Sequence, residues 1–61
     1  MMISTAAMIQ RLEGMLDTSG LITWEQDFVR KLAAVMRAGE VTQLTGAQVE
    51  KLDELHERHF G

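Results

Sequence analysis

Two histidines near the end of the sequence are the residues best suited to chemistry. His56 and His59 are one helical turn apart, so both imidazoles can reach one metal ion, with Glu57 or Asp53 as a further ligand. Histidines at the end of a helix rarely hold a metal without a third fixed ligand, and H-E-R-H is not the H-E-x-x-H pattern of zinc proteases. We therefore expect no metal site and no cofactor, with His56 half-buried and His59 exposed beside the last helix carbonyls.

Nucleophiles for catalysis are equally sparse. The chain has no cysteine, and its serines, Ser4 and Ser19, occupy predicted cap and loop positions. No glycine-rich loop follows a strand, and three short helices do not easily form a substrate cleft. The sequence therefore predicts no catalytic residue and a protein that is not an enzyme.

Length limits what this chain can do alone. Its 61 residues make a single small domain, 1–61, and such a chain buries only about 60% of the surface of its unfolded form. Without cysteine it has neither disulfides nor cysteine-based zinc sites to add stability. We therefore expect a homo-oligomer, in the simplest case a dimer, in which apolar residues near the N-terminus pack across the interface: Met1, Met2, Ile3 and Met8.

Composition is that of a globular protein, with 46% apolar and 25% charged residues. Apolar runs are only a few residues long, and the first residues lack a basic segment followed by an apolar stretch. We expect no membrane association and a cytoplasmic location.

Apolar periodicity predicts an all-α fold with three short helices, near residues 5–17, 24–38 and 46–59. Gly14 lies inside the first of these and weakens it by about 1 kcal/mol. The only strand candidate, residues 41–44, is too short to build a sheet. The second helix is expected to bury one face, formed by Trp24, Phe28, Leu32, Val35 and Met36 and widened by Val29.

Two capping signals fix the second and third helices. Thr23 precedes Gln26 at capping-box spacing, and Thr45 precedes Gln48 in the same way. Gly39 is placed to end the second helix. The short connection between Gly39 and Thr45 therefore predicts an antiparallel helical hairpin formed by helices two and three.

The last helix carries the acidic charge of the chain. The net charge is −3, and carboxylates gather on one side of residues 46–59. The simplest interpretation is a solvated face that keeps the protein soluble. Alternatively, the carboxylates bind a basic partner or imitate the phosphates of nucleic acid. The predicted partner-binding residues are Glu50, Asp53, Glu54 and Glu57.

A small helix–turn–helix DNA-binding regulator is the alternative from another class. Its reading helix would present Lys51 and Gln48 among several carboxylates, which is electrostatically unfavourable beside phosphates. A basic patch of Arg11, Arg30, Lys31 and Arg37 is the main argument for it. Nucleic acid is therefore the less favoured partner.

Trp24 admits two interpretations. A lone tryptophan in the first turn of a small helical protein usually closes the core, and this is the reading we favour. Tryptophan is also enriched among the residues that anchor protein interfaces.

Thr23-Trp24-Glu25 with Phe28, then Leu44-Thr45 with Gln48 and Leu52, resembles a helical module of small phage and mobile-element proteins. Its pattern is T-x-W-E-x-x-F followed, after a glycine turn, by L-[ST]-x-x-Q-x-x-x-L, and here Thr23 directly precedes Trp24. The resemblance covers about residues 22–60. It implies an accessory protein that acts by binding, and the inhibitors of that context include anti-CRISPR proteins. We therefore expect a non-enzymatic protein-binding module that occupies a surface of a larger protein complex.

Overall fold

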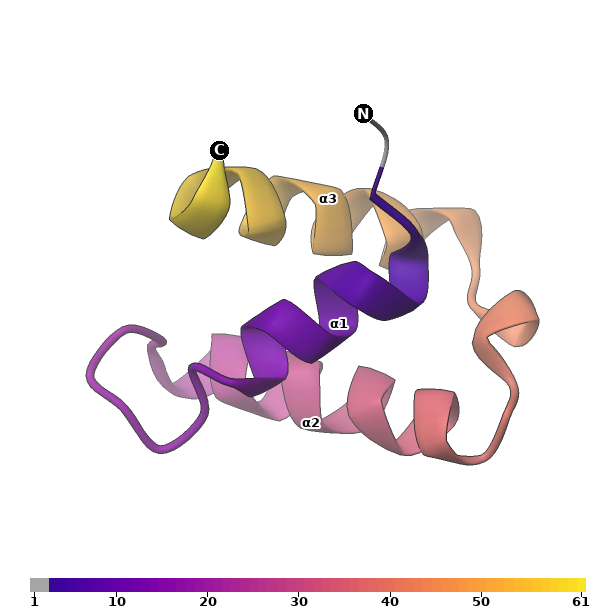
Figure 1. Ribbon diagram of the computed structural model, residues 1–61, viewed down its shortest axis with the longest axis horizontal. Helices are drawn as coiled ribbons and strands as arrows, with labels where there is room; N and C mark the ends of the chain where they lie inside the picture. The colour runs from indigo at the N-terminus through magenta and orange to yellow at the C-terminus, as the bar shows by residue number, and fades with distance from the viewer. Residues whose placement is uncertain (1–2) are drawn as a thin grey trace.

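A computed structural model describes residues 3–61, and within that range the chain is all-α, as predicted. Met1 and Met2 lie outside the described residues. The ordered elements are three α-helices, with a short 3-10 helix before the last (Figure 1). They are α1 (Thr5–Glu13), α2 (Thr23–Arg37), η1 (Val41–Gln43) and α3 (Gly46–Phe60).

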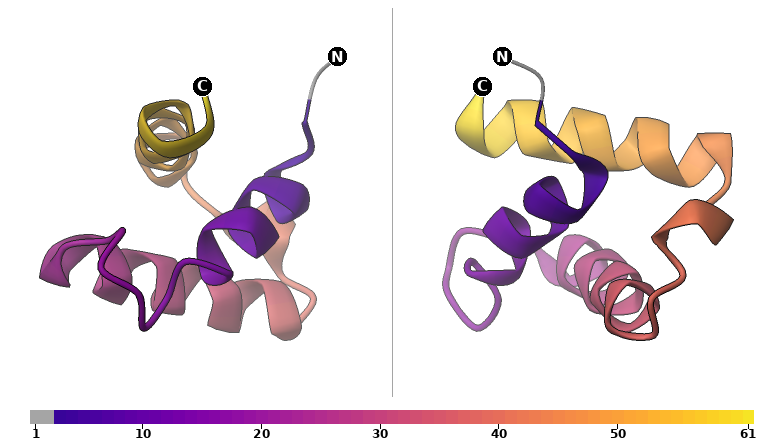
Figure 2. Two further views of the ribbon diagram at one scale, coloured as in Figure 1. Left: turned by 60° about the vertical axis from the view of Figure 1, so that its left-hand side comes forward. Right: turned by 45° about the vertical axis from the view of Figure 1, so that its right-hand side comes forward.

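The first helix lies between the other two. In Figure 1, α1 crosses the space between α3 and α2, and it packs against both of them. The structure does not show the antiparallel hairpin expected for α2 and α3. In the left view of Figure 2, α3 is seen end-on while α2 runs across the picture, so the two helices cross. Because α1 lies between α2 and α3, the segment that contains η1 connects the end of α2 to the start of α3 around it.

The core forms where the three helices meet. Ile9 and Leu12 of α1 are fully buried, and Leu52 of α3 is equally buried. Apolar side chains of this size stabilise the fold by about 1.5–3 kcal/mol each when they leave water. The buried apolar residues are Met8, Ile9, Leu12, Leu21, Val29, Leu32, Ala33, Leu52 and Leu55.

The capping box predicted before α3 is confirmed. The Gln48 N–H donates to Thr45 Oγ1 over 3.1 Å, and the Thr45 N–H donates to Gln48 Oε1 over 2.8 Å. The predicted stop at Gly39 is also confirmed. Gly39 has a φ of +74°, which suits a residue without a Cβ, and the Glu40 N–H donates to the Val35 carbonyl at 3.0 Å.

The predicted cap at Thr23 is wrong. Ile22 holds the extended cap position, and Thr23 is the first helical residue of α2. The side chain that hydrogen-bonds to the cap residue is that of Glu25, whose Oε1 accepts from the Ile22 N–H at 3.0 Å. Gln26 instead donates to the Leu21 carbonyl at 3.1 Å. A carboxylate is a better acceptor for an unpaired N–H at a helix start than an amide is.

The first helix is shorter than expected. It ends at Glu13, and Gly14 is its C-cap. Beyond it, Met15 and Leu16 donate to carbonyls three residues back, which is a tighter turn than an α-helix. Asp17 then adopts a left-handed φ of 64°, which closes the turn. Residues 41–43 form the 3-10 helix η1 and not a strand.

Replacing Thr45 by alanine removes a confirmed cap, so we expect a loss of about 1 kcal/mol in the free energy of unfolding. Thr23→Ala is the matched control, because Thr23 accepts no capping hydrogen bond, and its cost should stay within about 0.5 kcal/mol. Urea denaturation followed by circular dichroism measures both. Equal losses in the two variants would contradict the assignment of the caps.

Candidate functional site

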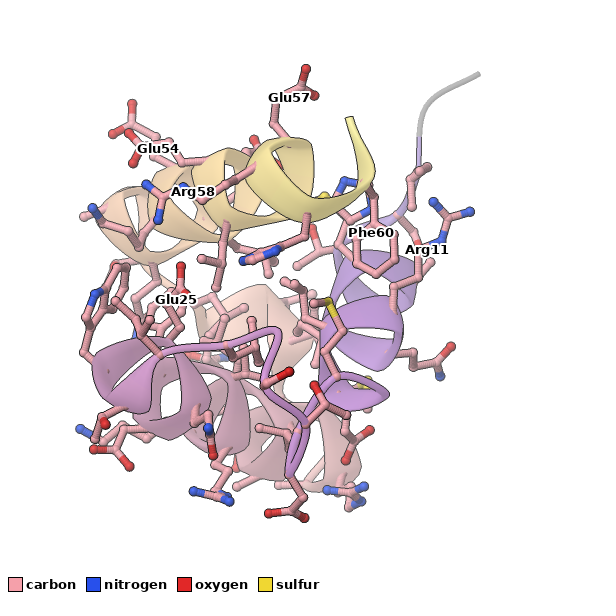
Figure 3. The ribbon with its side chains drawn as sticks, turned by 90° about the vertical axis from the view of Figure 1, so that its left-hand side faces the viewer. Arg11, Glu25, Glu54, Glu57, Arg58 and Phe60 are labelled. Atoms are coloured by element: carbon pink, nitrogen blue, oxygen red, sulfur yellow. The ribbon has the colours of Figure 1, made fainter. Side chains whose placement is uncertain are left out.

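The predicted acidic residues form one exposed row on α3, which we call the acidic stripe. Its members are Glu50, Asp53, Glu54 and Glu57. Their spacing places them on one helix face, opposite the buried Leu52 and Leu55. Figure 3 shows Glu54 and Glu57 pointing away from the body of the protein.

Little of this charge is neutralised within the chain. Lys51 Nζ lies 3.4 Å from Glu54 Oε2, in an exposed pair of the kind that contributes little stability. Among residues 3–61, no ion pair involves Glu50, Asp53 or Glu57. The acidic stripe therefore presents most of its negative charge to solvent.

The favoured prediction that Trp24 belongs to the core is wrong. Its side chain is 44% exposed, and the neighbouring Ile22 is 58% exposed. Lys51 Nζ lies 5.6 Å from the centre of the indole ring, within cation–π range. Lys51 therefore contacts both the indole and Glu54, so Trp24 borders the acidic stripe.

The buried face of α2 is turned by about one position from the predicted one. Glu25, Val29, Leu32 and Ala33 are its buried residues. Phe28, Val35 and Met36 are half-buried rather than central. Glu25 takes the inward place that was expected for Trp24.

Glu25 is a buried carboxylate at the point where the start of α2 meets the end of α3. Its side chain is only 3% exposed, and Arg58 Nη1 donates to Oε2 over 2.9 Å. His59 Nε2 lies 3.6 Å from the same oxygen. With the Ile22 N–H on Oε1, both carboxylate oxygens have partners. Figure 3 shows Glu25 in the space between the two helices.

The environment of Glu25 favours its charged form. Burial by itself would raise the pKa of this carboxyl, but the Ile22 N–H and the neighbouring His59 and Arg58 outweigh burial and hold the pKa below the ordinary 4.5. Nothing in the spacing of the sequence indicates this cluster, because Arg58 is 33 residues from Glu25.

The two histidines have different surroundings. His56 is 8% exposed, lies 3.4 Å from Arg11 Nη1, and stacks on Phe60 with ring centres 5.2 Å apart. His59 is more enclosed than expected, with its side chain 16% exposed. Across the described part of the chain, no three potential ligands gather around one point.

The basic patch considered for DNA binding is partly neutralised. Arg30 Nη2 lies 3.2 Å from Asp17 Oδ1, and Arg37 pairs with Glu13. Arg11 contacts His56. These pairs place carboxylates among the cations that would have to meet phosphates, which disfavours nucleic-acid binding.

The residues expected to drive self-association lie partly inside the protein. Met8 belongs to the core at 8% exposure, and Ile3 packs against that core half-buried. Met1 and Met2 are outside the described residues. The large apolar side chains most exposed in the described range are Ile22, Trp24 and Phe60.

Comparison with known protein families, with curated proteins and with solved structures finds no match to this chain. The resemblance to phage and mobile-element proteins therefore stays a prediction. Within residues 3–61, no helix has the length and apolar character needed to cross a membrane.

Glu25→Gln removes the buried charge but keeps the side-chain shape. We expect it to lower the free energy of unfolding by about 2 kcal/mol near neutral pH. Because the pKa of Glu25 is lower in the folded protein than the ordinary 4.5, its contribution is present above that pH and lost as the pH falls through the folded value.

The difference in the free energy of unfolding between the wild-type chain and Glu25→Gln, measured by urea denaturation, should therefore narrow as the pH falls from neutral to below 4.5. Glu57→Gln, which changes an exposed carboxylate of the acidic stripe, is the control and should cost less than about 0.5 kcal/mol. A gap between the wild-type chain and Glu25→Gln that is independent of pH would contradict the assigned charge state.

Proposed function

We propose that this chain is a non-enzymatic protein-binding module that covers a basic surface of a larger protein complex. The observation that supports the proposal best is the position of Trp24, exposed at the border of the acidic stripe and joined to it through Lys51. An exposed tryptophan supplies a large apolar anchor, and charges beside it supply orientation and speed of association. The buried cluster around Glu25 fixes the helix turn that carries the anchor.

The biological setting belongs to the same proposal. An accessory protein of a phage or mobile element, of the inhibitor kind to which anti-CRISPR proteins belong, is the setting that the resemblance of residues 22–60 implies. Such an inhibitor would act in the cytoplasm. Carboxylates spaced along one helix are suited to occupy a groove that normally binds phosphates.

Self-association is a separate part of the proposal. With Met8 in the core, the dimer contact expected near the N-terminus rests on Ile3 and the residues before it. Sedimentation equilibrium over a range of protein concentrations tests it. A single species with the mass of one chain throughout that range would remove the dimer.

Binding should depend on Trp24 more than stability does. We expect Trp24→Ala to lower the free energy of unfolding by no more than about 2 kcal/mol, because a fully buried tryptophan costs about 3–5. The same variant should recover at least about tenfold less partner in a pull-down from a lysate of the source cells. Phe28→Ala is the matched control, because Phe28 lies on the same helix but packs half-buried against the core. Its main effect should be on the free energy of unfolding and not on partner capture.

Charge reversal tests the stripe independently. Glu50→Lys with Glu57→Lys should weaken partner capture and remove its dependence on salt, while unfolding stays within about 1 kcal/mol of the wild-type value. Asp27→Lys, which reverses an exposed carboxylate on α2, is the control.

A gel shift with duplex DNA in about 150 mM salt addresses the DNA-binding alternative. If the protein binds this DNA with micromolar affinity and captures no protein partner at any salt concentration, the protein-binding proposal is wrong and a DNA-binding regulator takes its place.

A further inference from the structure

The indole of Trp24 already has a cation over it. Lys51 Nζ lies 5.6 Å from the centre of the ring and 3.4 Å from Glu54 Oε2. Trp24 belongs to the first turn of α2, whereas Lys51 and Glu54 are three residues apart on α3. One ammonium group therefore contacts both an aromatic ring and a carboxylate, and the two come from different helices.

Lys51 is held only weakly at this position. Its side chain is 49% exposed and that of Glu54 is 64% exposed, so solvent screens the ion pair. A cation–π contact at an exposed site is also weak. Neither residue belongs to the buried core, and Trp24 does not belong to it either. Another cation can therefore take the place of Lys51 without disturbing the fold.

We propose that Trp24 and Glu54 form a binding site for one arginine side chain of the partner protein, and that Lys51 occupies this site in the free chain. On binding, the guanidinium group replaces the ammonium group over the indole and pairs with Glu54, while Lys51 moves into solvent. The inference rests on the proposed function, because it names the chemistry by which the chain recognises a basic protein surface.

A guanidinium group suits this pair of side chains better than an ammonium group does. Its plane stacks on an aromatic ring, and its N–H groups can donate two parallel hydrogen bonds to one carboxylate. An ammonium group is a compact, strongly hydrated charge that does neither. Lys51 Nζ accordingly donates to a single oxygen of Glu54, at 3.4 Å. The site should therefore bind arginine more tightly than lysine, although the two carry the same charge.

The charges around the site also favour a cation. Glu50 and Asp53, which immediately precede Lys51 and Glu54, are exposed and have no ion pair within residues 3–61. Arg58, the one arginine of α3, pairs with Glu25 instead. An arginine that approaches this side of α3 therefore meets carboxylates that no cation of the described chain neutralises.

Hexa-arginine and hexa-lysine peptides of equal charge test the site on the purified chain. Trp24 is the single tryptophan and the chain has no tyrosine, so intrinsic fluorescence reports on this indole. In about 20 mM salt, hexa-arginine should change the emission of Trp24 and bind at least about threefold more tightly than hexa-lysine. Equal affinities for the two peptides would overturn the proposal.

Lys51→Met removes the competing ammonium group but keeps a long side chain. Lys31→Met is the matched control, because it makes the same change in net charge at an exposed position of α2. Hexa-arginine should bind Lys51→Met about threefold more tightly than Lys31→Met. If the two variants bind this peptide equally, Lys51 does not occupy the site and the proposal is wrong.

A further measurement uses the wild-type chain, so it needs no variant that folds. The ring current of the indole should shift the proton NMR signals of the Lys51 ε-methylene group upfield of those of Lys31. Saturation with hexa-arginine should return them towards the Lys31 position. Lys51 signals that do not move while hexa-arginine binds would contradict the displacement of Lys51.

These outcomes do not depend on the capture of a protein partner. Partner capture that persists although the two peptides bind equally would remove the arginine site and leave the proposed function standing. Arginine-selective binding at Trp24 by a chain that captures no partner would support the site and count against the proposed function.

Discussion

The packing of α1 between the other two helices determines the rest of this structure. Ile9 and Leu12 are fully buried because α2 covers one side of α1 and α3 covers another. In a chain of only 61 residues, this arrangement gives every helix an apolar neighbour. Both α2 and α3 contribute apolar residues to the core that surrounds α1. At the start of α2, Glu25 also pairs with Arg58 of α3, and the Trp24 ring lies beside Lys51 of α3.

The insertion of α1 explains the unusual placement of Glu25. A long side chain at the edge of the core can reach across to α3, where the Arg58 guanidinium and the His59 ring lie beside its carboxylate. Neighbouring positions on a helix lie about 100° apart, so with Glu25 turned inward the side chain of Trp24 lies towards the edge of the buried face. Trp24 is exposed for that reason. A buried carboxylate and an exposed indole are therefore two consequences of one rotation of the helix.

Local signals were sufficient for part of this fold. Thr45 with Gln48 and the stop at Gly39 depend on residues only a few positions apart, so the sequence predicts them correctly. The end of α2 and the start of α3 follow from the same signals. The acidic stripe is exposed as predicted because carboxylates at helical spacing, opposite leucines, have no better place than solvent.

Long-range contacts limited the rest of the prediction. Hydrophobicity alone places a tryptophan inside and a glutamate outside, whereas the buried Glu25 is paired with the distant Arg58 as well as with the nearby Ile22 N–H. The length of the connection between α2 and α3 favours a hairpin, but it carries no information about whether a third helix enters between them. The end of α1 at Glu13 agrees with the low helix propensity of Gly14, which is a local signal in the sequence.

The distribution of charge follows from the same geometry. Arg30 pairs with Asp17 of the loop after α1, and Arg37 pairs with Glu13 at the end of α1. Arg58 pairs with Glu25, so these three cations join one part of the chain to another. The carboxylates of α3 point the other way, because the buried side of that helix is already occupied by leucines. These arginines thus pair with carboxylates of other segments, while unpaired negative charge collects on the outer face of α3. A surface of this kind repels phosphates and attracts basic protein surfaces, and the exposed indole at its border adds the apolar contact that charge alone cannot provide.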